Sequence, residues 1–173
     1  MKLWWIGLLV LAGMLSVGCH DTRDSHVQSG QRYMERSQWS EAVNEFNRAI
    51  ALGEDTPETY NNRGVALYWL AEYDQAISDF TRAMMLKPQF PQAYNNRGLA
   101  YYQKNDLGKA IADYTFAIKL DATYPEPYYN RAVAYQADGK KKEALADYEH
   151  FVSVSQDPRL LEQAKQEIEK LKR

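Results

Sequence analysis

The sequence predicts an all-α fold, a solenoid of helix-turn-helix repeats that ends in one further helix. Three small residues, Gly64, Gly98 and Ala132, are equally spaced along the chain, and aromatic and alanine positions recur with them at fixed offsets. A repeat unit of about 34 residues holds two helices and buries its apolar face only by stacking on its neighbours. Such a stack forms a curved surface that is suited to binding another molecule.

Residues 1–18 differ in composition from the rest of the chain. Met1-Lys2 gives a positive start, residues 3–15 are almost all apolar, and Ser16 to Gly18 are mostly small. This order of segments is typical of a secretory signal peptide. The apolar run is shorter than the roughly 20 residues of a membrane-spanning helix, so an uncleaved anchor is the weaker alternative.

Cys19 follows the signal segment directly and is the single cysteine of the chain. The stretch from Leu15 to Cys19 resembles the bacterial lipobox, with Ser16 where leucine is usual. The resemblance implies that Cys19 carries lipid, palmitate included, which would anchor the protein to a membrane. A lone cysteine forms no internal disulfide, which favours this non-structural use. Cleavage by the ordinary signal peptidase, leaving a free thiol, is the alternative.

Residues 19–28 are polar and are predicted to be a short tether between the lipid and the repeats. His20 follows the cysteine, where an aspartate in enterobacterial lipoproteins favours the inner membrane. The resemblance to those lipoproteins therefore implies a place in the bacterial cell envelope, at the periplasmic face of the outer membrane.

Four repeats are predicted in residues 29–158, as units of about 23–56, 57–90, 91–124 and 125–158. The second unit carries, in order, Tyr60, Gly64, Leu67, Ala76, Phe80, Ala83 and Pro88. The first unit is the most divergent, with His26 at the place of the first aromatic residue. Within each unit, small residues let the two helices approach, and the aromatic rings fill the remaining space.

These positions resemble the tetratricopeptide repeat (TPR) family over roughly residues 23–158. The resemblance implies a right-handed superhelix with a concave groove. TPR domains that clamp a terminal carboxylate use basic residues where this chain has Asn61 or Val27, Gln92 and Glu126, so that ligand is not implied. The layout is similar to that of small TPR lipoproteins of bacterial envelopes, which include pilotins and adaptors of cell-wall hydrolases.

Residues 159–173 are predicted to be a capping helix. An apolar stripe runs along one side of this segment, made by Leu160, Leu161, Ala164, Ile168 and Leu171. The other side is charged, as expected for the last helix of a solenoid. Pairing of the stripe with a second copy, in a homodimer, is the alternative.

Composition excludes several classes of function. The net charge is −2 with no dense basic patch, so nucleic acid is not expected as a partner. The three histidines, His20, His26 and His150, are scattered, and no cysteine pair accompanies them, so no metal site is expected. No phosphate-binding glycine loop or nucleophile elbow occurs. We therefore expect no catalytic residues, no cofactor and no enzymatic activity.

The candidate binding residues lie on the first helix of each repeat. Asn62, Asn96 and Asn130 are each two residues before the close-packing position, about 200° around the helix, and so face away from the core of the helix pair. Their amides suit the backbone of an extended peptide. The neighbouring apolar and aromatic floor of the groove comprises Val65, Leu99, Tyr68, Trp69 and Tyr102.

Two of these interpretations have structural alternatives. The asparagines could bond only to the adjacent repeat, and Trp69 could pack under the tether or against the first repeat.

A third recurring pattern places an aspartate at one constant spacing after each of three arginines. The pairs are Arg63 with Asp79, Arg97 with Asp113, and Arg131 with Asp147. We expect these arginines to form ion pairs inside each repeat, with anion recognition as the alternative.

The sequence thus predicts a non-catalytic, membrane-anchored scaffold that binds a protein or peptide in its concave groove, in envelope assembly or cell-wall processes. One alternative is a self-assembling structural module. Another is a glycan-binding module that uses Trp69, Tyr68 and Tyr102 as stacking platforms.

Overall fold

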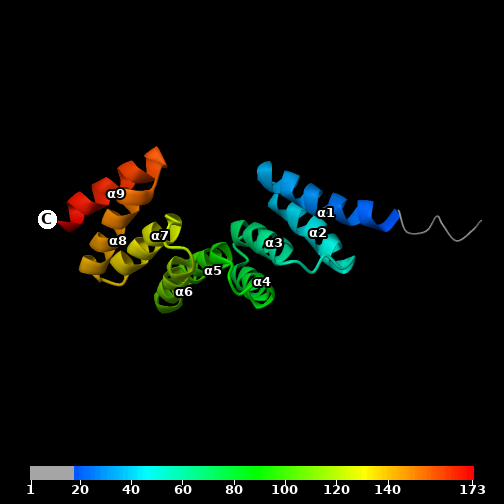
Figure 1. Ribbon diagram of the computed structural model, residues 1–173, viewed down its shortest axis with the longest axis horizontal. Helices are drawn as coiled ribbons and strands as arrows, with labels where there is room; N and C mark the ends of the chain where they lie inside the picture. Colours follow the sequence, from blue (N-terminus) through cyan, green and yellow to red (C-terminus); the bar gives the residue numbers. More distant parts are fainter. Residues whose placement is uncertain (1–17) are drawn as a thin grey trace, which may run out of the picture.

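The computed structural model describes residues 18–173, and side chains from His26 onward. The predicted signal peptide therefore lies outside the described residues except for Gly18. The described part is all helical, as predicted (Figure 1). Its helices are α1 (Gly18–Glu35), α2 (Trp39–Ala51), α3 (Pro57–Trp69), α4 (Tyr73–Leu86), α5 (Pro91–Gln103), α6 (Leu107–Leu120), α7 (Glu126–Ala137), α8 (Lys141–Val154) and α9 (Pro158–Leu171).

Local sequence signals explain where several helices begin. Thr56 caps α3 by accepting a hydrogen bond from the backbone N–H of Thr59 at 3.1 Å, and Pro57 follows at the first helical position. Asp157 and Pro158 start α9 in the same way. The helix α1 begins at Gly18, so residues 19–28, which we expected to be a tether, have helical backbone in the structure.

The turn inside each repeat places one residue in the left-handed region of φ. These residues are Ser37, Ala71, Asn105 and Gly139, with φ of 57°, 61°, 59° and 77°, and they lie at equivalent positions of the four repeats. Only the last is a glycine, the residue that adopts this conformation without steric cost. The same turn is therefore imposed four times by packing of the helices that flank it.

The helices stack in chain order and form an arch that is open at the top of Figure 1. Each helix packs on the next, and in addition the odd-numbered helices α1, α3, α5 and α7 contact one another from repeat to repeat. No comparable contacts link the even-numbered helices of the described chain to one another. The odd-numbered helices therefore form the inner side of the curve, and the even-numbered helices form the outer side.

Close helix approach in the second and third repeats requires glycine. A Cβ atom built on Gly64 would lie 2.7 Å from Cε1 of Phe80, and one on Gly98 would lie 2.6 Å from Cε1 of Tyr114. Both aromatic side chains are buried in the middle of their helix pairs. The glycines predicted to be close-packing positions thus let an aromatic ring lie directly against the partner backbone.

The last helix covers the end of the stack. Ala164 and Ile168 of α9 are buried against Tyr128, Tyr148 and Phe151 of the fourth repeat, and the leucines of the apolar stripe pack around them. The stripe that could have paired with a second copy is thus covered by the chain's own fourth repeat. The far side of α9 is lined by charged and polar residues, Glu162, Lys165, Gln166, Glu169, Lys170 and Arg173, which offer no surface for a further repeat.

Candidate functional site

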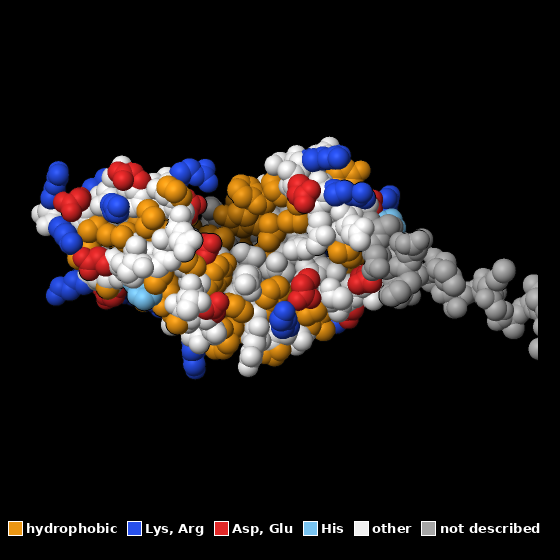
Figure 2. All heavy atoms as spheres, turned by 45° about the horizontal axis from the view of Figure 1, so that its top comes forward, with side chains coloured by type: hydrophobic (Ala, Val, Ile, Leu, Met, Phe, Trp, Pro, Cys, Tyr) orange, Lys and Arg blue, Asp and Glu red, His pale blue; other side chains and the backbone are white. Residues whose placement is uncertain are grey.

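The inner face of the arch is built from one stripe on each odd-numbered helix. On α3 the stripe contains Asn62, Val65 and Trp69, whose offsets of three and seven residues place them on one side of a helix. On α5 the equivalent residues are Asn96, Leu99 and Gln103, and on α7 they are Asn130, Val133 and Ala137. Figure 2 shows hydrophobic side chains gathered in the hollow of this face.

Two of the three predicted asparagines bind the preceding repeat. Asn96 donates from Nδ2 to Oδ1 of Asn61 at 3.0 Å, and Asn130 donates in the same way to Asn95 at 2.9 Å. These are the bonds to the adjacent repeat that the structural alternative for the asparagines expects. The equivalent acceptor position in the first repeat is Val27, which has no polar side chain. Among the described residues, the amide of Asn62 thus lacks the partner that the other two have.

Val65 and Leu99 are half-buried between repeats. Val65 and Tyr68 pack beside Leu67 and Phe80 of the second repeat and Ala100 of the third. Leu99 packs in the same manner beside Ala110 and Tyr114, together with Tyr102. These two aliphatic residues of the predicted groove floor therefore mainly hold the stack together, and they present only part of their surface to the groove.

Trp69 is the most exposed aromatic residue of the predicted site, with 60% of its surface accessible. Its ring stacks on Trp39 of α2, with centroids 5.4 Å apart and an interplanar angle of 12°. Tyr68 contacts it edge-on, with centroids 5.8 Å apart. The structure thus combines the two interpretations of Trp69, because the side chain packs on the first repeat and still offers a large apolar surface to solvent.

A second part of the inner face forms a hollow of about 400 Å³ between α5, α7, α8 and α9. Tyr102, a predicted site residue, lines it. The other lining residues are Tyr129, Val133, Gln136, Ala137, Tyr148 and Glu167. Sequence reasoning missed the contributions of Tyr129, Tyr148 and Glu167, because the repeat pattern does not show that α9 continues the inner face beyond the fourth repeat.

The recurring arginines form ion pairs within the second, third and fourth repeats, as predicted. Arg97 donates from Nε and Nη2 to the two carboxylate oxygens of Asp113, each at 2.8 Å, and Arg63 and Arg131 do the same with Asp79 and Asp147. The hydrogen bonds from Arg97 to Asp113 raise the pKa of the guanidinium. Each pair is bidentate and partly buried, so these arginines belong to the framework of the repeats rather than to an anion site.

A third bond from each arginine reaches back to the preceding repeat. The Nη1 atoms of Arg63, Arg97 and Arg131 donate to Asn47, Thr81 and Thr115. The first repeat has no such arginine, and there Glu45 pairs with His26 at 2.6 Å and with Arg48 at 2.6 Å. The arginines therefore fix the angle between successive repeats, and with it the curvature of the inner face.

Cys19 falls within α1, and its side chain is outside the described part. No group of three or more potential metal ligands occurs among the described residues. Within the same residues, no helix has the length and apolar character needed to cross a membrane.

Comparison with known families identifies the repeat. Residues 30–70, 71–105 and 98–139 match the family model described as a TPR repeat, and residues 125–158 match the model described as a tetratricopeptide repeat. The chain belongs to the tetratricopeptide repeat family. The TPR protein matches no curated protein sequence.

Solved structures share the TPR fold. The crystal structure of YrrB, described as a TPR protein with an unusual peptide-binding site, is 20% identical with a TM-score of 0.72, covering 85% of this chain and 76% of that chain. The crystal structure of MamA is 23% identical with a TM-score of 0.68, covering 86% and 79%. The first TPR of Spaghetti (RPAP3), bound to the HSP90 peptide SRMEEVD, is 26% identical with a TM-score of 0.63, covering 68% and 90%.

Proposed function

We propose that this TPR protein is a non-catalytic scaffold whose inner face binds an extended segment of a protein partner. The observation that carries the proposal is the exposed stack of Trp69 on Trp39, on the same face as the tyrosine-lined hollow. Large exposed aromatic side chains on a concave surface are typical anchors for a protein ligand. The peptide-binding site described for YrrB and the HSP90 peptide bound to the first TPR of Spaghetti support this use of the fold.

Asn62 gives the same face a group for backbone recognition. Its amide lies two helical turns before Trp69 and lacks the acceptor that Asn61 and Asn95 give to the other asparagines. An amide offers both a donor and an acceptor to a peptide bond without demanding a particular side chain. The proposed contact area is therefore centred on α3, with Asn62 for the backbone and Trp69 for an apolar side chain.

We further propose that the scaffold is anchored in the bacterial cell envelope by lipid on Cys19, at the periplasmic face of the outer membrane. The signal-like segment 1–18 and the lipobox-like stretch before Cys19 support this location. Since α1 begins at Gly18, little chain separates that cysteine from the first repeat. A scaffold attached in this way would hold its partner close to the membrane, where envelope assembly and cell-wall processes take place.

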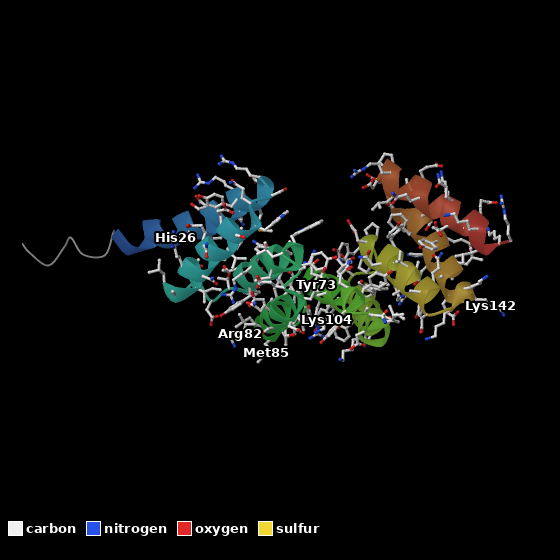
Figure 3. The ribbon with its side chains drawn as sticks, turned by 180° about the vertical axis from the view of Figure 1, so that it is seen from behind. His26, Tyr73, Arg82, Met85, Lys104 and Lys142 are labelled. Carbon is white, nitrogen blue, oxygen red and sulfur yellow. The ribbon has the colours of Figure 1, made fainter. Side chains whose placement is uncertain are left out.

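The binding proposal is tested by crosslinked pulldown from bacterial envelopes, with bound proteins identified by mass spectrometry. The comparison is between wild type, Trp69→Ala and the control Met85→Ala. Met85 is a large apolar residue, 68% exposed, on the outer helix α4, and Figure 3 shows it on the side away from the opening of the arch. We expect a protein that is captured by wild type and Met85→Ala and is lost with Trp69→Ala. Equal capture by all three would move the site away from the inner face.

The anchoring proposal is tested separately with Cys19→Ser. Cells fed with labelled palmitate should label the wild-type protein and not this variant, and the variant should leave the membrane fraction. Labelling of neither protein, with the mature chain in the soluble fraction, would support cleavage by the ordinary signal peptidase instead. This result would leave the proposed binding surface unaffected.

A further inference from the structure

The hollow at the C-terminal end of the inner face has an unusual set of walls. Aromatic rings come from Tyr102, Tyr129 and Tyr148, and Glu167 is the single charged side chain among its lining residues. Tyr148 is buried and forms part of the floor of the hollow, whereas Tyr102 and Tyr129 are half-buried. Faces of aromatic rings attract cations, and a carboxylate in the same hollow adds a direct charge.

Hydrogen bonds hold Glu167 in place. Its Oε2 accepts from Nε2 of Gln136 at 3.0 Å, and Oε1 of Gln136 accepts from the hydroxyl of Tyr148 at 3.1 Å. These two hydrogen bonds connect the carboxylate of Glu167 to the buried floor of the hollow. Bonds from Lys170 and Gln136 lower the pKa of Glu167, so the carboxylate is charged at neutral pH.

The cation that already touches Glu167 comes from outside the hollow. Lys170 donates from Nζ to Oε1 of Glu167 at 2.6 Å, but it lines the far side of α9, and 67% of its side chain is exposed. An exposed ion pair between residues three apart on a helix contributes little to stability, because water screens the two charges. A basic side chain that entered the hollow would therefore compete with a weak partner.

We propose that this hollow binds a lysine or arginine side chain of the partner segment, with the tyrosine rings around its cation and the carboxylate of Glu167 beside it. The inference rests on the proposed function, because it assigns the chemistry of a ligand for the same inner face. A hollow of about 400 Å³ is large enough for one such side chain. A site of this kind prefers basic ligands, whereas the peptide bound to the Spaghetti TPR is acidic.

The position of the hollow suggests how a segment lies on the protein. Trp69 is on α3, and the hollow is centred on α7, two repeats further along the inner face. With interaxial distances of about 10 Å between packed helices, the two places are roughly 20 Å apart. An extended chain covers that distance in about six residues. The partner segment is thus expected to carry an apolar residue and, at roughly that separation, a basic one.

The test selects twelve-residue peptides from a random phage-displayed library against the full chain in detergent micelles. Fluorescein-labelled copies of the selected peptides then give dissociation constants by fluorescence anisotropy. We expect enrichment of Lys and Arg, and binding at least about fivefold weaker to Glu167→Gln. Lys170→Gln removes the protein's own cation that competes for Glu167, so this variant should bind the peptides about twofold more tightly. A merely structural role of the ion pair would not produce these opposite signs.

Controls separate this inference from the proposed function. Glu143→Gln removes an exposed acid from the outer helix α8 and should leave affinity unchanged. Selected peptides that need Trp69 but show no basic enrichment, or that bind Glu167→Gln as tightly as wild type, would overturn the cation site and leave the binding face intact. Peptides whose affinity survives both Trp69→Ala and Glu167→Gln would overturn both proposals. Circular dichroism of each variant checks that the helices are retained.

Discussion

Asn96 on α5 donates a hydrogen bond from Nδ2 to Oδ1 of Asn61 on α3, over 3.0 Å. The acceptor is buried and the donor is half-buried, so this bond links the inner helices of two successive repeats away from bulk water. The asparagine that looks like a ligand-binding group in the sequence is therefore, in the third and fourth repeats, also part of the joint between repeats. Asparagine at this position links two repeats through Asn96 and Asn130, whereas Asn62 of the second repeat makes no such bond to a described residue.

Replacing Asn96 should destabilise the protein, whereas replacing Asn62 should not. Asn96→Ala leaves the buried oxygen of Asn61 without its donor, and we expect the free energy of unfolding to fall by about 1–2 kcal/mol. Asn62→Ala breaks no hydrogen bond to a described residue and should change it by less than about 0.5 kcal/mol. Urea denaturation followed by circular dichroism measures both. Equal losses for the two variants would contradict this assignment.

Adding one methyl group at Gly64 should strain the second repeat. The new Cβ of Gly64→Ala would lie 2.7 Å from Cε1 of Phe80, which is buried, so the ring would have to shift and we expect a loss of about 1–3 kcal/mol. Gly108→Ala is the matched control, because its Cβ would meet nothing within 4 Å. Gly108 lies in α6, where alanine favours the helix, so Gly108→Ala should raise the free energy of unfolding by up to about 1 kcal/mol. Thermal unfolding of the two variants should shift in opposite directions.

The ion pair inside the third repeat should matter far more than an ion pair on the surface. Asp113→Ala leaves the guanidinium of Arg97 partly buried without its carboxylate, and we expect a loss of about 3 kcal/mol. Glu58→Ala breaks the exposed pair with Lys87 and should cost less than about 0.5 kcal/mol. Denaturation in urea compares the two. If Asp113→Ala lost no more stability than Glu58→Ala, the arginines would not be the framework residues described above.

The turn residue Ala71 should be improved by glycine. Its φ of 61° is costly for a residue with a Cβ atom, so Ala71→Gly should raise the free energy of unfolding by about 0.5–1 kcal/mol. Gly139 occupies the same place in the fourth repeat, with φ of 77°. Gly139→Ala should therefore lower stability by a similar amount. Changes of the same sign in both variants would show that φ does not decide the effect.

The amino-acid sequence determined the repeat, its period and the contacts inside each unit. Gly64 and Gly98 were predicted to be close-packing residues, and the structure places each against an aromatic ring. The pairing of Arg97 with Asp113 was likewise predicted from its recurrence. These contacts are accessible to sequence reasoning because they join two helices separated by a short turn, and the same physical constraint recurs in successive repeats.

The tertiary structure decided which predicted site residues are available to a ligand. Only the angle between successive repeats brings Asn96 to Asn61, Trp69 to Trp39, and Glu167 of α9 to Tyr102 of α5. That angle is set jointly by many contacts between repeats, such as the bond from Arg97 to Thr81, so no single position encodes it. A periodic pattern assigns the same role to Asn62 and Asn96. Their neighbours differ, because Asn96 meets the acceptor Asn61, whereas Asn62 has Val27 at the equivalent place and bonds to no described side chain.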